Sequence, residues 1–195
     1  MMDYPLDLRF KIATIGTRVR VTDAGGRMVA YVRKKKFRLK EDIGVYADED
    51  QRKLFFRIKA DHVIDFGATY RVALPDGTSV GAVGQEGMKS LWKSSYVLTD
   101  AAGGGIGRIH EENPWVKVLD GVMEAVPFAD AFGGLFFNPA YIVELRGDPA
   151  LRVAKQRSVF ESSFRLEKLK DFSEAEEDLI LAGVIMMVLL ERDRG

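Results

Sequence analysis

An apolar run near the C-terminus constrains the fold more than any other feature of this sequence. Residues 179–190, LILAGVIMMVLL, carry no polar side chain, and charged residues stand directly before and after them. Ser173 followed by Glu176 is typical of a capping box, which predicts a helix over residues 173–191. The last three turns of this helix are apolar on every side, so it has no polar face to expose to water.

Such a helix needs apolar surroundings. A membrane span needs about 20 apolar residues, whereas this run is shorter and is flanked by carboxylates. A helix lying along a membrane surface would need a polar face, which this one lacks. We therefore expect no transmembrane span and a helix buried inside the protein.

The rest of the sequence predicts β-hairpins. Leu6, Leu8 and Phe10 alternate with polar residues, as in a half-buried strand. Further β-forming runs flank turns rich in Gly and Asp, as in TRVRVTDAGGRMVAYV, TYRVALPDGTSVGAV, SYVLTDAAGGGIGRIH and AYIVELRGDPALRVAK. A closed antiparallel barrel of about 12 strands would surround the C-terminal helix and leave no exposed sheet edge. We expect one such domain over residues 1–195.

Several stretches resemble the LURP-one-related family of the tubby-like superfamily, a family related to the phospholipid scramblases. They are FKIATIG, YVRKKKFRLKEDIGVYADE, IKADHVIDF, GMKSLWKSSYVLTD, HEENPWVKVLDG, NPAYIVELRGD and MMVLLERDRG. The resemblance covers residues 10–195 and implies a barrel wrapped around a C-terminal hydrophobic helix. It implies no enzymatic activity, since relatives are discussed as lipid-binding, membrane-tethered or regulatory proteins. The calcium-binding segment and cysteine-rich acylation tract of scramblases have no counterpart, so the resemblance does not imply lipid translocation.

Composition and the first residues limit the kinds of partner and the cellular compartment that we expect. Lys plus Arg equals Asp plus Glu at 29 each, so no global field attracts nucleic acid. The sequence has no cysteine, which excludes disulfides, thiolate metal sites and cysteine nucleophiles. The first residues lack the basic and apolar regions of a secretory signal. We therefore expect a cytoplasmic protein.

A basic run, RKKKFRLKED at residues 33–42, is the candidate binding site. On an extended strand Lys34, Lys36, Arg38 and Lys40 would share one face. Four cations on one face favour binding of an anionic phospholipid head group or an acidic protein surface. The alternative is a solvated outer face whose charge is neutralised by nearby acidic residues.

No motif for catalysis or for a cofactor is present. There is no G-x-S-x-G and no GK[ST]. His62, His110 and Glu112 do not follow the spacing of any known metal-binding motif. We therefore expect no metal and no catalytic residue. The favoured function is a non-enzymatic binding or interaction module acting through its outer surface. The alternatives are an enzyme with its active site on barrel-end loops around His110, or a nucleic-acid-binding regulatory protein.

Overall fold

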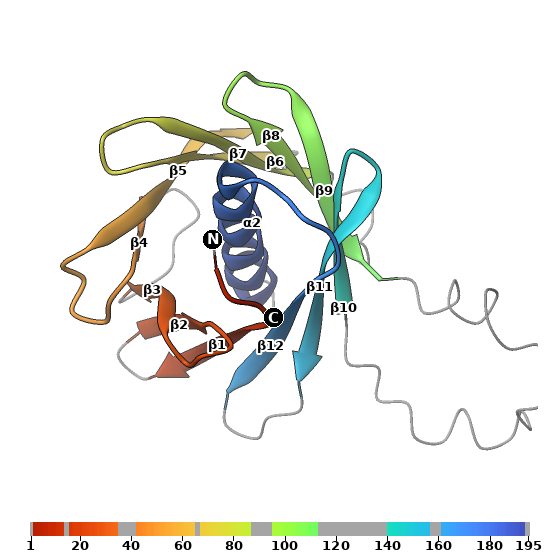
Figure 1. Cartoon of the computed structure of the whole chain (residues 1–195). Helices are drawn as coiled ribbons and strands as arrows, with labels where there is room; N and C mark the ends of the chain where they lie inside the picture. The colour runs from red at the N-terminus through yellow and green to blue at the C-terminus, as the bar shows by residue number, and fades with distance from the viewer. Residues whose placement is uncertain are drawn as a thin grey trace, which may run out of the picture.

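The computed structural model describes residues 2–13, 16–34, 42–64, 67–86, 95–112, 140–156 and 161–193. Figure 1 labels the strands and the helix in these ranges. The strands are β1 (Leu6–Ala13), β2 (Gly16–Thr22), β3 (Met28–Lys34), β4 (Ile43–Tyr46), β5 (Leu54–Ile64), β6 (Gly67–Ala73), β7 (Ser79–Glu86), β8 (Ser95–Asp100), β9 (Gly105–Glu111), β10 (Ala140–Leu145), β11 (Asp148–Gln156) and β12 (Ser162–Lys168), and the helix is α2 (Glu174–Asp193).

The strands form one closed barrel. They follow one another around the wall in sequence order, and every neighbouring pair is antiparallel. The first and last strands close the ring, with Leu6 opposite Leu166 and Leu8 opposite Phe164. Closure leaves no free edge in the ring. The predicted antiparallel barrel of about 12 strands is therefore confirmed.

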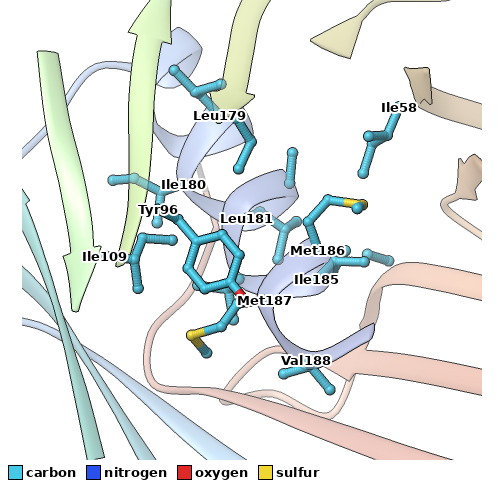
Figure 2. Close-up of a cluster of buried hydrophobic side chains, with 14 of the residues drawn as sticks. Ile58, Tyr96, Ile109, Leu179, Ile180, Leu181, Ile185, Met186, Met187 and Val188 are labelled. Carbon is cyan, nitrogen blue, oxygen red and sulfur yellow. The ribbon is translucent and has the colours of Figure 1, made fainter. Parts of the chain in front are cut away.

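The C-terminal helix runs through the barrel (Figure 1). Every residue from Leu179 to Leu190 is buried, and Figure 2 shows several of these side chains among those of the barrel wall. Ser173 caps the helix as expected: its backbone N–H donates to the Glu176 carboxylate over 2.8 Å, and its Oγ accepts from the Glu176 N–H at 3.4 Å. Among the described residues, no helix has both the length and the apolarity needed to cross a bilayer.

The helix lies against one side of the barrel. It contacts β7 and β8, and Figure 1 shows it close to this part of the wall. Gly183 permits the approach, because a Cβ there would lie 2.9 Å from Ile109 Cδ1 and 3.0 Å from Leu98 Cδ2. The absence of a side chain at Gly183 thus lets α2 pack closely on β8 and β9.

Aspartates hold the hairpin turns at the end of the barrel where α2 begins. Asp76 Oδ1 accepts from the Thr78 N–H over 2.9 Å, and Asp100 Oδ1 accepts from the Gly104 N–H over 2.8 Å. The N–H groups of Arg52 and then Lys53 donate to Asp48 and hold the pKa of its carboxyl below the usual range. The Asp- and Gly-rich turns expected from the sequence are therefore confirmed.

Candidate functional site on the outer barrel wall

Basic residues on neighbouring strands stand side by side on the outer wall. Lys11 of β1 pairs with Arg18 of β2, which pairs with Arg33 of β3. β3 meets β4 at the pair Tyr31 and Tyr46, and Gly44 of β4 pairs with Arg57 of β5. We name Lys11, Arg18, Arg33 and Arg57 the basic row.

Alternation along each strand turns this row outward. The residues beside its members, such as Val19, Val32 and Ile58, are buried against the core, and adjacent side chains on a strand point to opposite faces. All four members of the basic row are accordingly exposed. Paired strands are spaced about 4.8 Å apart, so the backbones of Lys11 and Arg33 lie about 10 Å apart along the wall, and Arg57 lies two strands further on. Since these strands curve around the barrel (Figure 1), the row forms a convex arc.

The charge of the basic row is not neutralised by ion pairs within the described part of the chain. None of its four members makes a salt bridge to a described acidic residue. The adjacent row differs, because Arg9 lies 3.7 Å from Glu161 and Arg20 pairs with Glu49. The basic row therefore adds net positive charge to this part of the wall.

The structure describes only the start of the predicted basic run. Lys34 is the last residue of β3 and pairs with Thr17, but its side chain lies outside the described part. Lys36, Arg38 and Lys40 lie outside the described residues altogether. The binding site predicted from these four residues therefore stays a prediction, and Arg33 is the member of the run that the structure places in the basic row.

Sequence reasoning missed Lys11, Arg18 and Arg57 as members of one site. The alternating patterns LDLRFKI, TRVRV and FFRIK already place these residues on the polar faces of their strands. The strand pairing that aligns them is not contained in any one pattern. A prediction of the register between β1, β2 and β3 would have found the first three cations of the row.

The residues considered for a metal site do not converge. His62 lies on β5 and His110 on β9, with β6, β7 and β8 between them, which separates them by about 19 Å along the wall. His110 Nε2 instead lies 3.1 Å from Glu144 Oε1, while Glu112 accepts from Arg152 Nε over 3.0 Å. Within the described ranges, no cluster of three or more His, Cys, Asp or Glu residues could hold a metal ion.

Several charged side chains on the wall from β9 to β12 are paired with one another. Besides Glu112, Arg152 lies 3.5 Å from Glu167, and Arg165 lies 3.7 Å from the same carboxylate. Opposite charges balance along this network. It therefore offers less attraction to an anionic partner than the basic row does.

No protein-family model and no curated protein matches this chain. The similarity to the LURP-one-related family accordingly remains a prediction from the quoted stretches. The basic row is the surface of the described structure on which a function can be argued from geometry.

Proposed function

We propose that this chain is a non-enzymatic binding module that holds an anionic phospholipid surface against the basic row. The observation that carries the proposal is the alignment of three exposed cations across β1, β2 and β3, with a fourth exposed on β5 and none of the four paired with a described acidic residue. A basic residue close to an anionic membrane contributes about 1 kcal/mol of attraction. The row would therefore give weak binding that salt screens effectively.

The shape of the barrel supports an extended partner rather than a small enclosed ligand. Apolar side chains of α2 fill the interior, and the basic row lies on a convex wall. Lysine and arginine side chains are long and flexible, so the cations at the flanks of the arc can still reach toward a flat surface. The anionic cytoplasmic leaflet is the partner that we propose, and the predicted contribution of Lys34, Lys36, Arg38 and Lys40 to this attraction stays a prediction.

The resemblance to the LURP-one-related family supports the same proposal. Its relatives are discussed as lipid-binding or membrane-tethered proteins, and the family implies no catalytic residues. A binding role through the outer wall is consistent with both expectations.

A matched pair of variants tests the proposal. Arg18→Gln/Arg33→Gln removes two charges from the basic row, and Arg52→Gln/Arg108→Gln removes two charges elsewhere. Arg52 and Arg108 are suitable because their side chains are 84% and 61% exposed. The assay is co-sedimentation with phosphatidylcholine vesicles with or without phosphatidylserine, at about 25 mM and about 150 mM salt.

We expect the wild type to bind only the anionic vesicles, and more weakly at the higher salt concentration. The Arg18→Gln/Arg33→Gln variant loses two contributions of about 1 kcal/mol each, so it should bind anionic vesicles about 30-fold more weakly than the wild type. The control variant should bind like the wild type. Equal losses in both variants, or a wild type without salt-sensitive binding, would contradict the proposal.

A further inference from the structure

Residues 2–5 lie at the end of the barrel where α2 begins. The Met2 N–H donates to both carboxylate oxygens of Glu177, each at 3.1 Å, and Figure 1 shows the start of the chain close to α2. Glu177 stands in the first turn of the helix and is only 2% exposed. The two residues are 175 positions apart in the sequence. The first described residues of the chain are therefore tied to the central helix.

Two further contacts hold this segment in place. The Ala24 N–H, in the turn between β2 and β3, donates to the Asp3 carbonyl oxygen over 3.0 Å. The Tyr4 ring packs edge-on against Phe172, with the ring centroids 5.9 Å apart. Burial, followed by the charge of Glu177 and a hydrogen bond to it, raises the pKa of the Tyr4 phenol, so the hydroxyl stays protonated and donates.

The barrel wall does not depend on these contacts. Pairing of β1 with β12 begins at Leu6, and its pairing with β2 begins at Asp7, so residues 2–5 form no ladder with either strand. Displacing them would break none of the hydrogen bonds that close the barrel. Segments held by a few contacts of this kind open locally at a lower free energy than the whole fold.

We infer that residues 2–5 are a strap that opens and closes over this end while the barrel stays folded, and that Glu177 holds the strap closed. The inference goes beyond the proposed membrane contact and does not depend on it. Glu177 suits this role because a buried carboxylate needs hydrogen-bond donors, and the strap supplies them. Hydrogen bonds to a carboxylate are also stronger than those between neutral groups.

Opening of the strap would change the surface at this end of the barrel. The Tyr4 ring would leave Phe172, which is 6% exposed in the closed form. The start of α2 would then present an apolar ring close to the carboxylates of Glu174 and Glu177. The strap therefore covers a surface that is both apolar and acidic, and its opening makes this surface accessible.

Amide hydrogen exchange measured by NMR tests whether residues 2–5 move as one unit. The Met2 and Ala24 amides report on the strap, because each donates across one of its contacts. The Asp100 amide, which donates to the Gly104 carbonyl over 2.8 Å, reports on a hairpin turn of the barrel. In the wild type at low urea concentrations, the Met2 and Ala24 amides should open together, with a smaller urea dependence than amides of the barrel strands.

A matched pair of variants tests the role of Glu177. Glu177→Gln removes the charge that holds the strap, whereas Glu174→Gln removes a charge from an exposed side chain in the same helical turn. Glu177→Gln should speed exchange of the Met2 and Ala24 amides about 10-fold, and Tyr4→Phe should speed it about 5-fold. Glu174→Gln should match the wild type. The Asp100 amide should not change in any variant.

A single introduced thiol tests whether the strap covers Phe172. The sequence has no cysteine, so Phe172→Cys carries one thiol at the place where the Tyr4 ring packs. A thiol reagent labels this position only when it is accessible. Glu177→Gln in this background should speed labelling about 10-fold, and Glu174→Gln should leave the rate unchanged.

The outcomes decide the inference. Faster exchange at Met2 without faster exchange at Ala24, or equal acceleration at Asp100, overturns the strap as a separate unit. Exchange and labelling rates that do not change in Glu177→Gln overturn the role of Glu177. If Glu177→Gln does not fold, Tyr4→Phe and the urea dependence in the wild type still decide the result, because separate opening of the Met2 and Ala24 amides would overturn the strap.

Discussion

A larger side chain at Gly183 tests how closely α2 packs inside the barrel. A Cβ at this position would meet Ile109 Cδ1 at 2.9 Å and Leu98 Cδ2 at 3.0 Å. These atoms are the ends of flexible side chains, so small shifts can accommodate alanine. Alanine also improves helix propensity by about 1 kcal/mol relative to glycine, which offsets the strain. We therefore expect the free energy of unfolding of Gly183→Ala to lie within about 1 kcal/mol of the wild-type value.

Gly183→Leu should be far more harmful. Leucine adds three further carbons where Ile109 and Leu98 are already fully buried, and protein interiors leave little free volume. Overpacking typically costs about 1–3 kcal/mol, and three carbons directed at a strand wall should reach at least the upper end of this range. A loss of about 3 kcal/mol is a large part of the stability of an ordinary domain.

Urea unfolding followed by far-ultraviolet circular dichroism measures these changes. Ala175→Leu is the control, because Ala175 is exposed in the first turn of the same helix. Ile109→Ala should partly rescue Gly183→Leu, with a coupling of about 1–3 kcal/mol, because it removes the atom nearest to the added side chain. Wild-type stability of Gly183→Leu, or no coupling to Ile109, would refute the close packing of α2 against β9.

Three further predictions concern the start of α2 and one strand. Burial, with the negative charges of Glu174 and Glu177, raises the pKa of Asp178 to about 6, so the folded state binds this proton more tightly than the unfolded state. Asp178→Asn should therefore raise the free energy of unfolding at pH 7.5 by roughly 1 kcal/mol after solvent screening, and in urea titrations this gain should shrink as the pH falls below about 6 and vanish only below the ordinary pKa of 3.8. Ser173→Ala should cost about 1 kcal/mol in the same assay through loss of the cap, and an unchanged midpoint would contradict that role. Gly107→Ala should lower the melting temperature strongly, because its Cβ would lie 2.1 Å from the backbone oxygen of Glu144; a wild-type melting curve would count against this contact.

The sequence alone determined the elements and the way they are assembled. The capping box at Ser173 and the uniformly apolar run that follows specify a buried helix, because both signals lie within one segment. Alternating strands and Asp- and Gly-containing turns specify hairpins for the same reason. A helix with no polar face then requires an enclosing wall, which made a closed barrel predictable before any strand pairing was known.

Only the tertiary structure decided which surface residues stand together. Lys11, Arg18 and Arg33 come from three strands and stand side by side because of the strand register, and Arg57 joins this outer wall from β5. Local periodicity reports which face of its own strand a residue takes. It does not report the hydrogen-bond register between strands, and a slip of one residue would turn every side chain of a strand to the opposite face.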